Sequence, residues 1–146
     1  MNNLFNMASV NFYSEEINYT LKSKRKTIAW IIEAIQSEGK RAGEINIIFC
    51  SDEYLYKLNI GYLNHDTYTD IITFNFSEDK GVISGDIYIS LERARDNAKE
   101  FKQLLQTELR RLIIHGVLHL CGYKDKSQKD KALMTLKEDY YLSLRP

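Results

Sequence analysis

The chain has 146 residues, which suffices for one domain with a full hydrophobic core but hardly for two. Its 20 Lys and Arg balance 20 Asp and Glu, so no global positive field indicates a nucleic-acid partner, although a local patch could still bind one. An apolar share of 44% and an aromatic share of 12% are typical of a folded soluble protein and exclude a disordered chain.

The first half of the chain predicts strand, helix, strand and helix. SVNFY (9–13) suits a short edge strand, and apolar residues recur at helical spacing from Thr27 to Ile35, with Gly39 and Gly43 as possible stop signals. EINIIFCS (44–51) reads as a buried strand, after which Ser51 can cap a helix through residue 63. A basic cluster before the first helix is expected to be its solvated start rather than an RNA contact: Lys22, Lys24, Arg25 and Lys26.

The second half predicts a hairpin followed by three helices. TDIITFNFSE (69–78) and GVISGDIYIS (81–90) are rich in β-branched and aromatic residues and flank a short charged turn, which is typical of two antiparallel strands. Ser90 can cap a helix over 91–104. LLQTELRRLIIHGVLHL (104–120) has a wide apolar stripe and predicts a buried helix that ends at Gly122, before a last helix over 128–144.

This order predicts an α+β fold: a small mixed four-stranded sheet with an antiparallel hairpin, covered by helices, with the late central helix packed against it. We find no internal repeat, low-complexity segment or interdomain linker, and therefore expect a single domain over residues 1–146.

Cys50 and Cys121 are the two thiols, and the chain has no recognisable signal peptide and no apolar run near the roughly 18 residues of a membrane span. A reducing cytoplasm is the simplest location, and neither a disulfide framework nor a membrane partner is expected. Cys121 should lie on a different side of its helix from His119 and belong to the core.

The chemistry is concentrated in HGVLHLCGYKDK (115–126). His115 and His119 are four residues apart and therefore share one helix face, and a turn at Gly122 brings Asp125 near the same point. Two imidazoles, one carboxylate and an open fourth position describe a catalytic rather than a structural zinc site. The sequence thus predicts one zinc ion per chain, at the C-terminal end of the central helix, in a single metallohydrolase domain.

Paired histidines at this spacing are often only a surface or capping feature. Here they are two of three histidines and stand on a mostly apolar helix, where unpaired imidazoles would be costly to bury. Gly116 within that helix indicates close packing or a ligand that needs room. Zinc peptidases carry their general base after the first histidine, where this chain has Gly116, so a metal-dependent peptidase is the weaker alternative.

The segment HGVLHLCGYKD resembles the H-G-x-L-H-L-x-G-Y-D-H signature of the YbeY-type endoribonucleases. LNIGYLNHDTYTDIITFNF is similar to the family segment that ends in T-D-V-L-S-F-P, and GDIYIS matches its G-D-I-x-I-S strand. Order and spacing agree over about residues 44 to 140. The resemblance implies an α+β fold and zinc-dependent cleavage of single-stranded RNA. It also implies work on ribosomal RNA, especially the 3′ end of 16S rRNA, and on the small ribosomal subunit in ribosome quality control, with no DNA partner.

Carried over residue by residue, the resemblance makes His115 and His119 the first two metal ligands. Asp125 takes the third position, where the family usually has histidine, and Lys124 replaces the preceding aspartate. Leu63 stands where the family commonly has an arginine, so another cation must neutralise phosphate. Candidates by position are His65, Lys124 and Lys126, each of which could equally be a plain surface residue.

Three questions stay open. Asp70 could accept a hydrogen bond from a ligand imidazole or orient a ligand, or merely cap the start of its strand. The attacking group could be water or the RNA 2′-hydroxyl. The rival function from another class is a non-catalytic ribosome-assembly factor with a structural metal.

Overall fold

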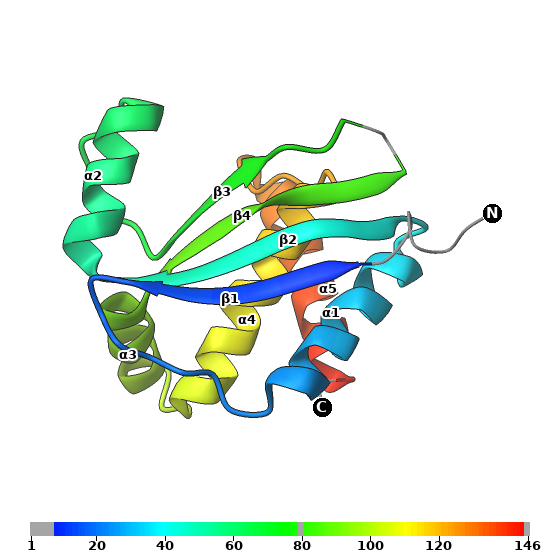
Figure 1. The fold of residues 1–146 in the computed structure, drawn as a ribbon, viewed down its shortest axis with the longest axis horizontal. Coiled ribbons are helices and arrows are strands. Elements are labelled where there is room, and N and C mark those ends of the chain that lie inside the picture. Colours follow the sequence, from blue (N-terminus) through cyan, green and yellow to red (C-terminus); the bar gives the residue numbers. More distant parts are fainter. Residues whose placement is uncertain (1–7, 79–80, 145–146) are drawn as a thin grey trace.

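The computed structural model describes residues 8–78 and 81–144 of the chain. This part contains one four-stranded sheet and five helices (Figure 1). In chain order the elements are β1 (Ser9–Glu15), α1 (Lys24–Ser37), β2 (Arg41–Cys50), α2 (Asp52–Leu63), β3 (Ile71–Asn75), β4 (Val82–Ser90), α3 (Leu91–Glu100), α4 (Leu105–Leu120) and α5 (Gln128–Ser143).

The sheet has the order β1-β2-β4-β3. β2 pairs in parallel with β1 and β4, and β3 pairs antiparallel with β4. The predicted edge strand, the hairpin and the mixed α+β sheet are therefore confirmed. The charged turn predicted within the hairpin, residues 79–80, lies outside the described residues.

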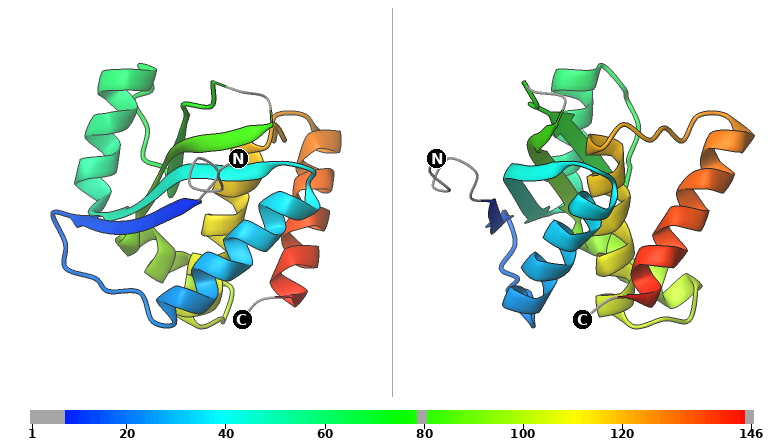
Figure 2. Two further views of the ribbon diagram at one scale, coloured as in Figure 1. Left: turned by 45° about the vertical axis from the view of Figure 1, so that its right-hand side comes forward. Right: turned by 90° about the vertical axis from the view of Figure 1, so that its right-hand side faces the viewer.

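One face of the sheet carries the core. Ile45 and Ile47 of β2 and Ile87 and Ile89 of β4 are fully buried and lie on the face that α1 and α4 cover. The right-hand view of Figure 2 shows α4 between the sheet and α5. Because α4 is buried from both sides, the side chains that it carries are held on a rigid element.

At Gly116, α4 lies close against the sheet. A Cβ atom at this position would lie 2.8 Å from Cγ2 of the fully buried Ile87. Ordinary carbon contacts are about 3.5 to 4.0 Å, so the glycine allows close packing of helix on strand. Close packing explains Gly116 without a ligand at that point.

Several element boundaries differ from those predicted. α1 begins at Lys24, earlier than Thr27, because its first turn is polar and gives no apolar periodicity. Gly39, with a φ of +77°, follows the end of this helix. Gly43 is no stop signal: it lies inside β2, where a Cβ atom would come within 3.0 Å of the carbonyl oxygen of Ile83.

The helix caps follow the sequence closely. The Ser51 hydroxyl accepts from the backbone N–H of Tyr54 at 3.0 Å, and the Ser90 hydroxyl accepts from that of Arg93 at 3.1 Å. The basic cluster is exposed at the start of α1, as predicted. Within the described part of the chain, none of the helices is both long and apolar enough to cross a bilayer.

Candidate metal centre

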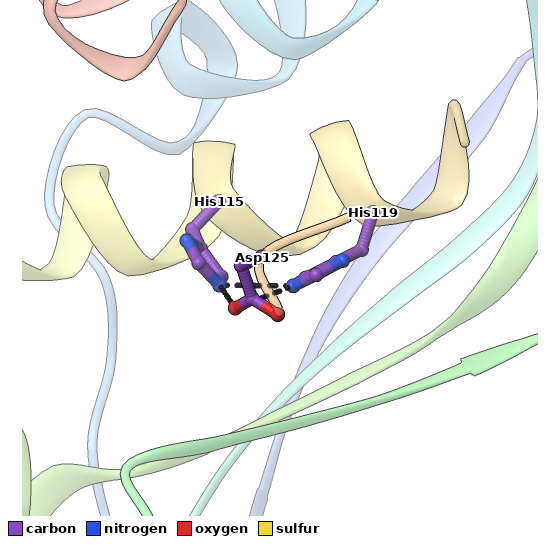
Figure 3. A group of neighbouring side chains, drawn as sticks. All are labelled: His115, His119 and Asp125. Carbon is purple, nitrogen blue, oxygen red and sulfur yellow. Dashed lines mark hydrogen bonds and ion pairs between the residues drawn. The ribbon is translucent and has the colours of Figure 1, made fainter. Parts of the chain in front are cut away.

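Three side chains converge at the C-terminal end of α4 (Figure 3). Nε2 of His115 lies 3.0 Å from Nε2 of His119. Oδ2 of Asp125 lies 3.2 Å from each of these two nitrogens. The structure thus brings together the three residues that the sequence singled out as ligands.

The loop after α4 is shaped so that Asp125 returns to the helix. Gly122 takes a φ of +109°, a conformation that favours glycine. The N–H of Gly122 donates to the carbonyl of His119 at 2.9 Å, and the N–H of Tyr123 donates to that of Leu118 at 3.0 Å. This compact helix end reverses the chain within three residues of His119.

Both imidazoles have their Nδ1 atoms occupied. His119 Nδ1 lies 2.9 Å from the carbonyl oxygen of Tyr123, which can only accept, so the ring proton is on Nδ1. His115 Nδ1 lies 2.5 Å from Oε2 of Glu138 and donates to this carboxylate. In the neutral rings each Nε2 is left with a lone pair that points toward the other ligands.

This arrangement fits a metal ion. Three lone-pair donors face one another, and one proton can bridge only two of them, whereas a metal ion accepts from all three. Around a tetrahedral zinc with bonds of about 2.0 to 2.2 Å, neighbouring donor atoms are separated by about 3.3 to 3.6 Å. The observed separations of 3.0 to 3.2 Å need to widen by only a few tenths of an ångström.

A chain of polar contacts extends from Glu138 into the protein. Glu138 lies 3.6 Å from the guanidinium of Arg111, which also pairs with the fully buried Glu108 at 2.5 Å. Asn97 donates to Glu108 and to Asp70, each at 3.1 Å. These contacts therefore connect the imidazole of His115 with Asp70, which lines a cavity beside the two histidines.

Negative charge is in excess in this network. With Asp125 it contains four carboxylates and one guanidinium. Burial lowers the pKa of His115, but its hydrogen bond to Glu138 and the charges of Glu138, Asp125 and Asp70 outweigh this effect and raise the pKa above its ordinary value. A surplus of carboxylates that favours positive charge on an imidazole also favours a bound cation.

The sequence interpretation missed Glu138 and the carbonyl of Tyr123 as partners of the imidazoles. A signal for Glu138 was present, since Met134, Glu138 and Tyr141 form the buried stripe of α5 and an acid in such a stripe needs a partner. Asp70, the candidate for such a role, instead accepts from Asn97, and among the described contacts no hydrogen bond joins it to either imidazole.

A cavity of about 600 Å³ opens beside the candidate metal centre and is lined by both histidines and Asp125. Asp70, Leu63 and two of the predicted cations, His65 and Lys126, also line it. Lys124 is exposed and is not among the lining residues. The remaining walls come from Asn59, Thr67, Thr69, Ile71, Ile72 and Thr73.

The two cysteines take no part in the centre. Cys50 is fully buried, and burial raises the pKa of its thiol to about 12. Cys121 is partly buried against the core, and burial raises its pKa to about 11. Neither cysteine belongs to the group formed by His115, His119 and Asp125. Cys121 packs against the core, as predicted, although it is only partly buried.

The sequence is similar to one protein family over nearly its whole length. The model of the family described as Endoribonuclease YbeY matches residues 9–144. A protein of Flavobacterium psychrophilum named Endoribonuclease YbeY is 51% identical over 138 residues, which are 94% of this chain and 96% of that protein. A protein of Cytophaga hutchinsonii with the same name is 47% identical over 137 residues, or 94% and 96% of the two chains.

Among solved structures, the solution structure of TM1509 from Thermotoga maritima is similar, with a TM-score of 0.63 and 26% identity. The match covers 90% of this chain and 87% of that one. The family match includes every described helix and strand as well as the loop that carries Asp125.

Proposed function

The chain belongs to the Endoribonuclease YbeY family, and from this premise we propose that it is a zinc-dependent endoribonuclease that cleaves single-stranded RNA. We place its work in the cytoplasm, in maturation of the 3′ end of 16S rRNA on the small ribosomal subunit and in ribosome quality control. The single metallohydrolase domain that we propose extends over residues 1–146.

The observation that carries this proposal is the meeting of three lone-pair donors at the edge of an open cavity. His115, His119 and Asp125 would hold the metal, and all three line the cavity. Structural zinc sites usually have four protein ligands, so an open set of three supports catalysis. When bound, zinc supplies Lewis acidity toward phosphoryl oxygens and makes water a stronger acid.

The protein's own groups keep this site ordered. Glu138 and the carbonyl of Tyr123 each hold one imidazole in the tautomer that directs Nε2 inward. Asp125 adds a negative charge where the family usually has a neutral imidazole. The more anionic ligand set should make the metal a weaker Lewis acid than a set of three histidines.

The cavity gives the path that we propose for the RNA. Lys126 and His65 line it and are the nearest predicted cations for a phosphate, whereas Lys124 would contact RNA only outside it. Leu63 lines the same cavity and is 39% exposed. Its side chain is apolar and cannot bind phosphate.

A cleavage assay tests the proposed function. Rigorously nuclease-free protein should cleave a single-stranded RNA internally, leave the corresponding duplex intact, and lose this activity in His119→Ala. A substrate with one 2′-deoxy nucleotide at the cleaved position distinguishes the nucleophiles, since attack by the 2′-hydroxyl stops and attack by water continues. RNA binding without any cleavage would favour the non-catalytic assembly factor, and cleavage of a peptide instead would favour the peptidase.

A further inference from the structure

The loop that carries Asp125 is tied to a distant helix through a single tyrosine. The carbonyl oxygen of Tyr123 accepts from Nδ1 of His119 at 2.9 Å, and Asp125 follows two residues later. The phenol of Tyr123 donates to Oε1 of Glu38, the C-cap residue that follows α1, at 2.6 Å. Tyr123 is therefore bound to the metal centre by its backbone and to α1 by its side chain.

Glu38 is built into the structure as an acceptor. Its side chain is only 9% exposed and also accepts from Nζ of Lys137 at 3.2 Å and from the hydroxyl of Tyr141, both on α5. Burial raises the pKa of Glu38, but hydrogen bonds from Tyr123, Tyr141 and Lys137 outweigh burial, and the pKa is lowered. The carboxylate is thus an anion that joins α1, α5 and the loop between α4 and α5, here called the ligand loop, which contains Tyr123 and Asp125.

The ring of Tyr123 is fixed from more than one side. The ammonium of Lys137 lies 5.6 Å from the ring centre, within the range of a cation–π contact. The ring also packs against the hydrophobic core. A side chain held in this way limits the positions that its own backbone carbonyl can take.

We propose that Glu38 is a positioning residue of the metal centre, which acts through Tyr123 on the orientation of His119 and on the placement of Asp125. The inference rests on the proposed function only in taking these two residues as metal ligands. Removing a partner that orients a ligand typically lowers metal affinity by about 10- to 100-fold. Glu38 does not contact a ligand itself but acts through Tyr123, so we expect its removal to lower zinc affinity by about tenfold, at the lower end of that range.

Tyr141 provides a matched control. Its hydroxyl donates to the same carboxylate, but its backbone belongs to α5, where its carbonyl accepts from Nε1 of Trp30 at 2.9 Å. Tyr123→Phe and Tyr141→Phe each delete one hydroxyl that donates to Glu38. Of the two tyrosines, only Tyr123 also contacts a proposed metal ligand, through the hydrogen bond between its carbonyl and His119.

The test compares wild type, Tyr123→Phe, Tyr141→Phe and Glu38→Gln, each as the full chain. Zinc affinity is measured by competition with a chromophoric chelator, the ligand field by the visible spectrum of the Co²⁺-loaded protein, and stability by urea unfolding of the metal-free form. Both phenylalanine variants should lose stability. Tyr123→Phe and Glu38→Gln should also bind zinc about tenfold more weakly and change the cobalt spectrum, while Tyr141→Phe retains the affinity and the spectrum of wild type.

Equal zinc affinity in all four proteins, or equal losses in the two phenylalanine variants, would reduce Glu38 to a structural tie between helices and overturn the inference. A wild type that binds no zinc would overturn the metal centre and this inference together. A wild type that binds zinc, with the expected losses in the variants, but cleaves no RNA would overturn the proposed enzyme alone.

Discussion

Glu138→Ala removes the carboxylate that accepts from Nδ1 of His115, and we expect it to weaken metal binding without unfolding the protein. In wild type the two atoms are 2.5 Å apart, Glu138 is 5% exposed, and the imidazole of His115 is 17% exposed. Removing a carboxylate that orients a ligating imidazole typically lowers metal affinity by about 10- to 100-fold, so we take about 2 kcal/mol, near the middle of that range, for the loss. That corresponds to a zinc affinity about 30-fold lower.

The assay is a zinc competition titration at constant pH and ionic strength, with two companion variants. Glu138→Gln keeps an acceptor oxygen and should show a smaller loss than Glu138→Ala. Asp139→Ala deletes the same charge from the adjacent, exposed position of α5 and should not change zinc affinity. If Glu138→Ala bound zinc as tightly as wild type, or if Asp139→Ala lost as much affinity, the hydrogen bond to His115 would not be what supports the centre.

Three further predictions concern Asp125 in the ligand loop, Leu63 in the cavity wall and Glu38. Asp125→Ala should weaken zinc binding by orders of magnitude and abolish cleavage, whereas Asp125→His should retain the metal. Lys124→Ala should leave zinc bound and at most weaken RNA binding; elemental analysis and RNA titrations would show these differences. Leu63→Arg should tighten binding of single-stranded RNA and steepen its salt dependence at unchanged metal content; an unchanged salt slope would place the RNA on another surface. Glu38→Gln should be about 2 kcal/mol less stable than wild type at neutral pH. Because the folded pKa of Glu38 lies below the usual 4.5, this difference should persist above pH 4.5 and shrink as the pH falls through the folded pKa, and urea unfolding between pH 7 and 3 would contradict the reasoning if it stayed constant.

Local patterns predicted most of the fold. Strand alternation, helical periodicity and the caps at Ser51 and Ser90 depend on residues a few positions apart, and each of these elements is present. The pair His115 and His119 was predictable for the same reason, since residues four apart lie on the same face of a helix. Predicted boundaries were wrong where one residue type suits two structures. Gly43 suits the end of a helix, but it also suits the close approach of two strands, which is what the structure has.

The residues that orient the two histidines of the candidate metal centre could not be predicted because tertiary packing creates these contacts. Glu138 is 23 residues from His115, and Glu38 is 85 residues from Tyr123. Nothing local to any of these residues specifies its partner. The loop motif indicated that Asp125 returns toward the helix, but the carbonyl that holds His119 belongs to the turn itself and has no side-chain signature.

We expect the protein to cleave single-stranded RNA with the help of one metal ion that His115, His119 and Asp125 would hold. The most direct measurement is a titration of metal-free protein with zinc, in which the initial rate of RNA cleavage and the bound zinc are determined on the same samples. We predict that cleavage is absent without metal, rises in proportion to bound zinc, and reaches its plateau at one zinc per chain, with no cleavage at any zinc level in His119→Ala. Cleavage by the metal-free protein, or a plateau that His119→Ala also reaches, would show that RNA cleavage does not depend on a metal ion at His119.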